Sequence, residues 1–271
     1  MSNSIRNRFV GLSKSLENYF LHFISRSDIL DSKTKKQGKI ILFEKEFYYH
    51  YGLAFYNTYI EIFRTKIYEF STKNERPVII DCGANMGLSI LYFSKNYPNA
   101  NIIAFEPDET VISFIEKNII SQNLTNVELH KKAVWTEETE LKFYTDKGLG
   151  GRVKKKYKNQ IPKVIKSVRL RDFLNKPIEM LKIDIEGSEY NVIKDCKDLL
   201  YNVNHIFIEY HSCFDEEQHL DDILNILKHQ GFRYHLRESF SRNKPFIDKQ
   251  LICEKFDMAI NIFAYKNAKA F

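Results

Sequence analysis

From residue 76 onward, short apolar runs alternate with longer segments in which apolar residues recur every three or four positions. The short runs predict buried strands and the longer segments predict helices. The last helical segment is followed by Gly231, and glycine often ends a helix. This alternation favours a parallel sheet with helices on both faces. Strands are expected at 78–81, 102–105, 127–134, 179–184 and 205–210, and helices at 88–96, 108–120, 188–200 and 215–229.

Two more strand-like runs, 232–237 and 257–265, close this series with no helix-length segment between them. A connection of that length, which contains Pro245 and several polar residues, favours an antiparallel pair. The prediction is therefore an α/β fold with a mostly parallel, seven-stranded sheet and a C-terminal antiparallel hairpin.

The residues before this series differ in character, so we expect an N-terminal helical and aromatic extension at 1–75 and the main domain at 76–271. Apolar residues from Ile5 to Phe23 recur at helical spacing and predict an amphipathic helix. Packing on the domain or on a second subunit, as in a homodimer, is favoured over a membrane-surface role. Residues 39–49 are strand-like and residues 59–63 are helical in pattern.

The net charge of +6 is unevenly distributed. Ten basic residues and no acid lie between Lys147 and Arg171, while acids outnumber bases in the rest of the chain. Such a run is either a solvated loop face or an electrostatic guide for an anionic substrate. It contains one aromatic residue, Tyr157, so the base stacking that nucleic-acid binding uses is weakly represented and nucleic acid is not the favoured partner.

The four cysteines form no C-x-x-C pair, which argues against a zinc knuckle or a redox motif. Neither a signal-peptide pattern nor an apolar run long enough to span a bilayer is present, so we expect a cytoplasmic protein without a transmembrane segment. Abundant Lys, Ile and Asn are typical of an AT-rich bacterial genome.

The clearest motif follows the strand at 78–81. Asp81, Gly83, Asn85 and Gly87 form a glycine-rich turn before a helix, and Glu106 follows the next strand. Glycines let a backbone approach a ligand, and an acid at the tip of the neighbouring strand can accept hydrogen bonds from a ribose. An acid before the turn would repel a pyrophosphate. The motif therefore favours S-adenosylmethionine, which has an ammonium group and no phosphate; the alternative is an ordinary strand-turn-helix.

From about residue 59 to the C-terminus, the chain resembles the FkbM family of class I, S-adenosylmethionine-dependent methyltransferases. The resemblance rests on 80–87, on Phe105-Glu-Pro107, on Ala133 and above all on Leu181-Lys-Ile-Asp-Ile-Glu-Gly-Ser-Glu189. It implies a Rossmann-like fold and O-methylation of a hydroxyl, often on a sugar, glycan or secondary metabolite. One departure is Leu170-Arg171-Asp172, where the family usually has Leu-Asp-Asp.

Within that resemblance, the cofactor site would use the turn, Glu106 and Pro107 for the methionine part and the ribose. Backbone near Ala133 would contact the adenine edge, and Asp184 could bind the methionine ammonium group. The predicted cofactor-binding residues are Asp81, Gly83, Asn85, Gly87, Glu106, Pro107, Ala133 and Asp184.

Four ionisable residues at the tips of the fourth and fifth strands are the predicted catalytic residues. Lys182 and Asp184 share a face of one strand, and Glu209 and His211 share a face of the other. Buried charges need partners, so Lys182 and Glu209 are expected to form an ion pair beneath the site. His211 is the predicted base for a hydroxyl proton. Asp184 either orients His211 or binds the cofactor.

A divalent ion, Mg²⁺ or Mn²⁺, is a further alternative, held by Asp184, Glu209 and His211 with Glu186. The leading function is O-methylation of a sugar-containing, anionic acceptor such as a nucleotide sugar, glycan or polysaccharide precursor. The alternatives are a nucleic-acid or secondary-metabolite methyltransferase and an inactive, methyltransferase-like binding module. No Asn/Asp-Pro-Pro-aromatic motif for methylating base amino groups is present.

Overall fold

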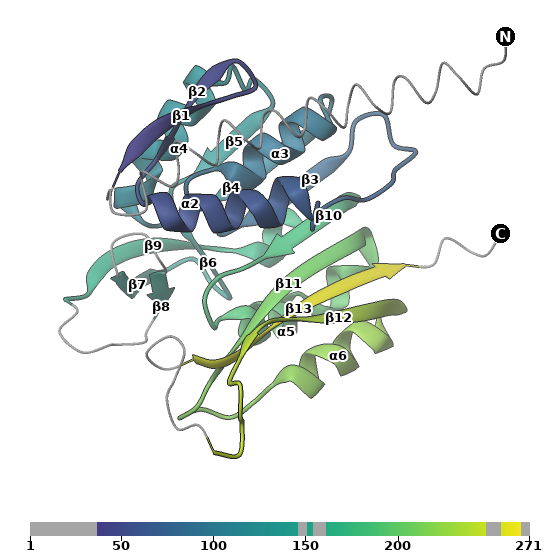
Figure 1. The fold of residues 1–271 in the computed structure, drawn as a ribbon. Coiled ribbons are helices and arrows are strands. Elements are labelled where there is room, and N and C mark those ends of the chain that lie inside the picture. Colours follow the sequence, from purple (N-terminus) through teal and green to yellow (C-terminus); the bar gives the residue numbers. More distant parts are fainter. Residues whose placement is uncertain (1–36, 146–150, 154–160, 248–255, 267–271) are drawn as a thin grey trace, which may run out of the picture.

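The computed structural model describes residues 37–145, 151–153, 161–247 and 256–266. Its centre is a seven-stranded sheet in the order β12-β13-β11-β10-β3-β4-β5 (Figure 1). All neighbouring strands run parallel except β13, which is antiparallel to β11 and β12. The predicted mostly parallel sheet with a C-terminal antiparallel pair is confirmed. The strands are β3 (Val78–Cys82), β4 (Asn101–Phe105), β5 (Val127–His130), β10 (Ile178–Ile183), β11 (Val203–Cys213), β12 (Phe232–Ser241) and β13 (Phe256–Lys266).

Helices cover both faces of this sheet. α5 (Glu189–Cys196) and α6 (Leu220–His229) pack on one face through a large apolar cluster. α3 (Leu88–Asn96) packs on the other face, and α4 (Glu109–Ser121) follows β4. The segment predicted as one helix at 188–200 is α5 followed by a 3-10 helix, Lys197–Asn202. Among the helices in the described part of the chain, none has the length and apolar character needed to cross a membrane.

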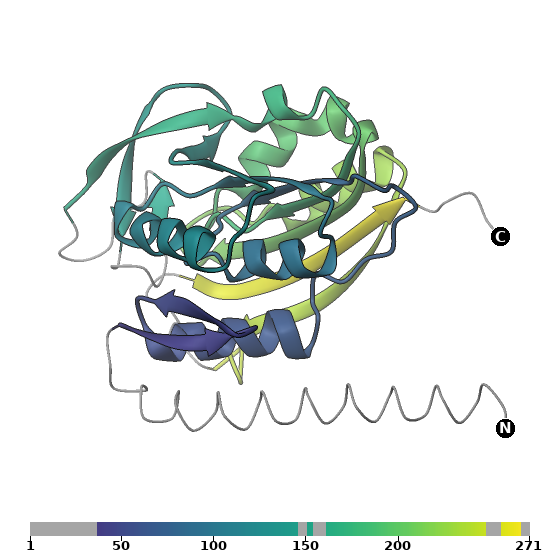
Figure 2. The same ribbon diagram turned by 90° about the horizontal axis from the view of Figure 1, so that it is seen from above.

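The described part of the N-terminal extension packs on the sheet face opposite α5 and α6 (Figure 2). The predicted strand at 39–49 is a hairpin, because Phe43 and Glu44 adopt left-handed backbone angles at its turn. The division at residue 75 stays a prediction, and the amphipathic pattern between residues 5 and 23 lies outside the described residues. The elements are β1 (Gly38–Leu42), β2 (Lys45–Tyr49), α2 (Gly52–Tyr59) and a π-helix, η1 (Ile60–Arg64).

Two buried amides attach this hairpin to α4. The Asn118 side chain accepts a hydrogen bond from Tyr48 N at 2.6 Å and donates to Tyr48 O and Met86 O at 2.9 Å each. Gln122 Nε2 donates to backbone carbonyls of the hairpin, including Leu42 O at 3.2 Å. A buried amide needs such partners, so these contacts fix the hairpin in one position. Met86 belongs to the glycine-rich turn, which links the extension to the site.

A small second sheet, in the order β6-β9-β7-β8, follows β5. The single strand predicted at 127–134 is therefore wrong: β5 ends at His130, and β6 joins β9 in this other sheet. The polar pair Lys131-Lys132 separates the two strands, and the buried side chains of Ala133 and Val134 belong to β6. The strands are β6 (Ala133–Trp135), β7 (Glu140–Thr145), β8 (Gly151–Val153) and β9 (Lys163–Arg169).

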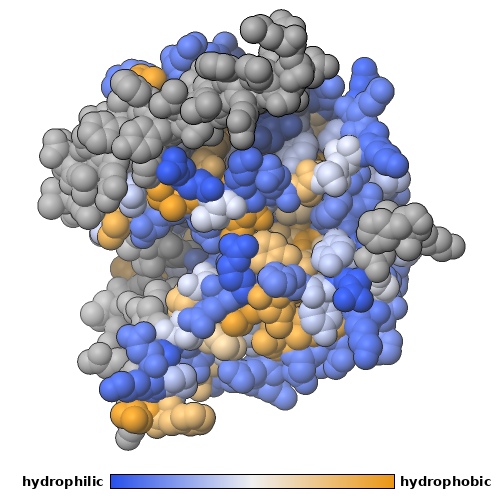
Figure 3. All heavy atoms as spheres, turned by 45° about the vertical axis from the view of Figure 1, so that its right-hand side comes forward, coloured by the Kyte–Doolittle hydropathy of each residue, from blue (hydrophilic) through white to orange (hydrophobic). Residues whose placement is uncertain are grey.

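An apolar patch lies among hydrophilic side chains on the face shown in Figure 3.

An apolar cavity lined by Ile67, Phe70, Met180, Phe207 and Phe263 lies near the N-terminal ends of β10 and β11. Ligands of open parallel sheets bind at the opposite, carboxyl ends of the strands. The site is therefore built at the other edge of the sheet.

Phe55 on α2 tests the packing of the extension. It is fully buried and lies against Phe47, Tyr49 and Tyr59, with ring centroids 5.6, 5.1 and 6.0 Å away. Phe55→Ala should lower the free energy of unfolding by about 3–5 kcal/mol, because it leaves a cavity. Leu53→Ala, on the same helix but 37% exposed, is the control and should cost less than about 1 kcal/mol. Equal losses in chemical denaturation would contradict this packing.

Candidate active site

The glycine-rich turn between β3 and α3 has little room for side chains. Gly83 and Gly87 both have a φ of 89°, and Asn85 has a φ of 46°. A Cβ atom on Gly83 would lie 1.9 Å from the carbonyl oxygen of Asp184. Gly83 N and Ala84 N donate to Phe105 O at 3.0 and 3.1 Å. Only glycine fits at position 83, and the turn is fixed against the ends of β4 and β10.

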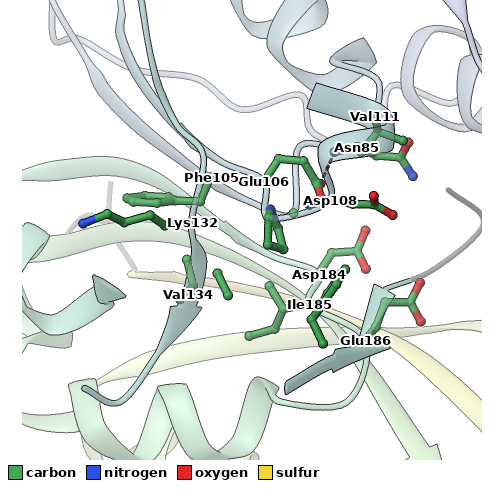
Figure 4. A pocket seen from close by; sticks show the side chains of 14 residues that line it. Asn85, Phe105, Glu106, Asp108, Val111, Lys132, Val134, Asp184, Ile185 and Glu186 are labelled. Atoms are coloured by element: carbon green, nitrogen blue, oxygen red, sulfur yellow. Dashed lines mark hydrogen bonds between the residues drawn. The ribbon is translucent and has the colours of Figure 1, made fainter. Parts of the chain in front are cut away.

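A pocket with about 680 Å³ of space, part of it open to solvent, lies beside this turn. Figure 4 shows that the carboxylates of Asp108, Asp184 and Glu186 gather at one end and that Phe105 and Lys132 lie at the other. The lining residues are Gly83, Asn85, Phe105, Glu106, Pro107, Asp108, Val111, Lys132, Ala133, Val134, Phe143, Asp184, Ile185 and Glu186.

Glu106 occupies the middle of the pocket lining and is held rigidly. Its Oε2 accepts from Asn85 N, and its Oε1 accepts from Asp108 N, both at 2.9 Å (Figure 4). The residue is 7% exposed. Burial raises the pKa of Glu106 to about 7, although the two backbone hydrogen bonds oppose that shift. The carboxylate is thus oriented before a ligand arrives.

Asp108 is a pocket residue that the sequence reasoning missed. It caps α4, because its Oδ1 accepts from Thr110 N at 2.8 Å. Its Oδ2 accepts from the hydroxyl of Thr145 on β7. Its position one residue after Pro107 and just before a helical pattern is an N-cap signal that could have identified it.

Two predicted cofactor residues do not line the pocket. Asp81 is fully buried beneath the turn, where it accepts from Ser89 Oγ at 2.5 Å. Gly87 precedes α3, and a Cβ atom there would lie 3.7 Å from Ile115. The contribution of both residues to the pocket is to support the turn, whereas Pro107 and Ala133 line it.

The ion pair predicted between Lys182 and Glu209 is wrong. Lys182 Nζ lies 3.1 Å from Asp81 Oδ1 and 3.6 Å from Asp184 Oδ2, and it donates to Gly83 O at 2.8 Å. The reason is the strand register, which sets Lys182 beside Asp81 on β3 and beside Phe207, two residues before Glu209, on β11.

These partners keep the buried lysine charged. Burial opposes the ammonium form, but Asp81 and Asp184 outweigh it, so the pKa of Lys182 is raised. Burial raises the pKa of Asp184, Lys182 lowers it and Glu209 raises it, and the net direction is upward. Glu209 itself accepts from Ser239 Oγ at 2.7 Å.

His211 lies at the end of β11 and is held by a glutamate from α5. Its Nδ1 is 3.2 Å from Glu189 Oε1, and its Nε2 is 3.8 Å from Glu186 Oε2. Glu189 is 1% exposed and also accepts from Gly187 N at 2.9 Å. Glu189, not Asp184, therefore orients the imidazole. Glu189 is the last acid of the segment 181–189 in the sequence, but its contact with His211 on β11 depends on the tertiary structure.

The pKa of His211 bears on its predicted role as a base. Burial lowers this pKa, but Glu186 and Glu189 outweigh burial and raise it well above the ordinary value. In the protein alone, the neutral imidazole that a base requires is therefore disfavoured.

The metal-ligand geometry differs from the predicted set. Ligand atoms of Asp184, Glu186 and His211 all lie within 4.8 Å of one another. Glu209 is not part of that cluster.

Several charges of the basic segment 147–171 are neutralised. Arg169 forms a bidentate pair with Asp195 at 2.9 and 2.6 Å, and Arg171 pairs with Asp198. Lys163 lies 3.4 Å from Glu109. Each of these three side chains already has an acidic partner. Residues 147 and 154–158 of this segment lie outside the described residues, so its role as a guide stays a prediction.

Gly83→Ala tests the close approach of the turn to β10. Gly231→Ala is the control, because Gly231 also has a left-handed φ, 80°, but nothing within 4 Å of a Cβ atom. Gly231→Ala should cost about 1–2 kcal/mol of unfolding free energy from backbone strain alone. Gly83→Ala should cost clearly more, because the Asp184 backbone must also move. Equal losses in urea denaturation would contradict this assignment.

Comparisons with known proteins identify the family of this chain. The family model described as "Methyltransferase FkbM domain" matches residues 81–234. The chain is 26% identical over 163 residues to Methyltransferase 1 of Beauveria bassiana, which covers 51% of this chain and 66% of that protein. It is 25% identical over 156 residues to the 2-O-methyltransferase NoeI of Sinorhizobium fredii, with 49% of this chain and 63% of that protein covered.

Among solved structures, the chain is similar to the methyltransferase FkbM of Methylobacillus flagellatus, with 17% identity and a TM-score of 0.47. That similarity covers 74% of this chain and 46% of the other. The family match includes the glycine-rich turn, Glu106 and the whole segment from Lys182 to His211, and it spans more than half of the sequence. The chain belongs to the FkbM methyltransferase family.

Proposed function

We propose that this protein transfers a methyl group from S-adenosylmethionine to a hydroxyl group of a sugar-containing acceptor. The observation that supports this most directly is the order of groups along the pocket. An end with apolar side chains comes first, Glu106 lies in the middle, and three carboxylates form the other end. Adenine, ribose and the cationic methionine part of the cofactor follow one another in the same order.

Each part of the cofactor has a suitable partner. Phe143, Val134 and the backbone near Ala133 offer an apolar place for adenine. Glu106 is positioned to accept hydrogen bonds from ribose hydroxyls. The sulfonium and ammonium groups would lie near the carboxylates of Asp184 and Asp108, where two acids favour a cation.

Side chains beyond Asp184 favour a polar acceptor. The strand register aligns Glu209, Asn261 and Arg237 in one row across β11, β13 and β12. Asn261 is 1% exposed, and its Oδ1 has no hydrogen-bond partner among the described residues. Glu61, on the π-helix, faces this row. Burial and the charge of Glu209 raise the pKa of Glu61, and a hydrogen bond with Asn261 lowers it. Rows of donors and acceptors suit the hydroxyls of a sugar.

The reaction needs little more than alignment and removal of a proton. The acceptor oxygen bonds to the methyl carbon as the bond from that carbon to sulfur breaks, and the electron pair of that bond goes to sulfur. The hydroxyl proton passes to a base, for which His211 is the predicted residue. Asp184 and His211 are the predicted catalytic residues nearest this point, Lys182 fixes the turn and Asp184 from below, and Glu209 faces the acceptor row. The anionic character of the acceptor remains a prediction.

The pKa of Glu106 gives a pH test of cofactor binding. The carboxylate, which accepts two ribose hydrogen bonds, forms only above its pKa of about 7. Below that pH, binding must displace a proton, so affinity should rise about tenfold between about pH 6 and about pH 8 and then level off. Calorimetric titration with S-adenosylmethionine measures this. Glu106→Gln should bind more weakly and should lack the step at about pH 7; a wild-type profile without that step would contradict the role of Glu106.

Substitution of His211 separates binding from turnover. His211→Ala should lose at least about a hundredfold in methyl transfer, because general acid–base and positioning roles commonly contribute that much. It should keep cofactor affinity within about threefold, because His211 does not line the pocket. The assay would follow labelled methyl transfer to a panel of nucleotide sugars, with RNA as the comparison. A wild-type protein that does not bind S-adenosylmethionine would overturn the function itself.

A further inference from the structure

Three potential metal ligands meet at the carboxyl ends of β10 and β11. One ligand atom from each of Asp184, Glu186 and His211 lies within 4.8 Å of the other two, a grouping that could hold a metal ion. Asp184 and Glu186 also line the pocket, and their carboxylates lie on the same side in Figure 4. The cluster therefore adjoins the place where the methyl group and the acceptor would meet.

Glu189 provides independent support for metal binding. A histidine that binds a metal usually donates its other ring N–H to a carboxylate, which fixes the tautomer and the ring orientation. Glu189 Oε1 lies 3.2 Å from His211 Nδ1, and the side chains of the two residues are 1% and 5% exposed. With Nδ1–H held in this way, Nε2 is the ring atom that remains toward Glu186 and Asp184.

The backbone turns Glu186 into this position. Glu186 has a φ of 58° and Gly187 a φ of 96°, so two consecutive residues are left-handed. A left-handed, non-glycine residue costs roughly 1–3 kcal/mol, and such residues are enriched at functional sites. The Gly187 N–H in turn donates to Glu189, which joins the strained turn to the carboxylate behind His211.

The local charge also favours a cation. Asp184, Glu186, Glu189 and Glu209 lie around His211, and Lys182 pairs with Asp184, so these four acids outnumber the two basic groups among them. Like charges this close repel one another strongly in a partly buried site. A divalent ion between the three inward-facing ligands would reduce that repulsion.

We propose that Asp184, Glu186 and His211 bind one divalent cation, Mn²⁺ or Mg²⁺, with Glu189 as the positioning residue behind His211. Two carboxylates and one imidazole suit either ion, and imidazole favours Mn²⁺ of the two. Three protein ligands leave coordination positions for an acceptor hydroxyl and for water. The inference rests on the proposed function, because the ion would hold the acceptor oxygen beside the methyl group and lower the pKa of its hydroxyl.

Direct metal binding tests the proposal without an acceptor. Full-length protein would be titrated with Mn²⁺, with and without S-adenosylmethionine, and free Mn²⁺ would be measured by electron paramagnetic resonance. One ion per chain is expected. Glu186→Gln and His211→Gln should each weaken binding by more than about tenfold, and Glu189→Gln by about 10–100-fold.

Glu209→Gln is the matched control. It removes the same charge from a residue that acts electrostatically on both Asp184 and His211 but lies outside the ligand cluster. Mn²⁺ affinity should stay within about threefold of wild type. Equal weakening by Glu209→Gln and Glu186→Gln would show diffuse attraction by the acids and overturn the site.

The wild-type titration decides the proposal even if a variant fails to fold. No stoichiometric Mn²⁺ binding by wild-type protein, and no increase in its melting temperature with Mn²⁺, would overturn the metal site. If the same sample binds S-adenosylmethionine, the methyltransferase proposal survives; if it binds neither, both fail. Where an acceptor is found, chelation should abolish methyl transfer, and Mn²⁺ or Mg²⁺ should restore it.

Discussion

A lysine ammonium group buried where two strands end is the interaction on which the site depends. Lys182 contacts Asp81 beneath the glycine-rich turn, the Gly83 carbonyl within it and Asp184 beyond it. A buried charge is tolerated only with close partners, and loss of one partner leaves the other unpaired. These contacts therefore hold the floor of the pocket and the Asp184 carboxylate together as one unit.

The charge arrangement above this floor matches the proposed cofactor. Acids gather at the end of the pocket where a cationic sulfur and an ammonium group would lie, whereas the opposite end has apolar side chains and Lys132. When no cation is present, these acids repel one another. Both the proposed cofactor and the proposed metal ion would bring positive charge to these acids.

Much of the fold could be predicted from the sequence because apolar periodicity is a local property. The parallel strands, the following helices and the antiparallel pair at the C-terminus were found at nearly the right residues. The strand predictions are wrong where pairing with a strand distant in the sequence sets the structure. Residues 127–134 are apolar enough for one strand, but Ala133 and Val134 belong to β6, which pairs with β9 in the second sheet.

Residue type and spacing are enough to predict the main parts of the pocket: the glycine-rich turn, Glu106 and the charged residues near the ends of β10 and β11. Only the tertiary structure decided the partners. The register of three strands set Lys182 beside Asp81, away from Glu209. The start of α5 brought Glu189 to His211, and the left-handed turn brought Glu186 into the ligand cluster. Spacing along a strand fixes which face a side chain occupies, but its distance to another strand depends on register and helix packing, which no single segment encodes.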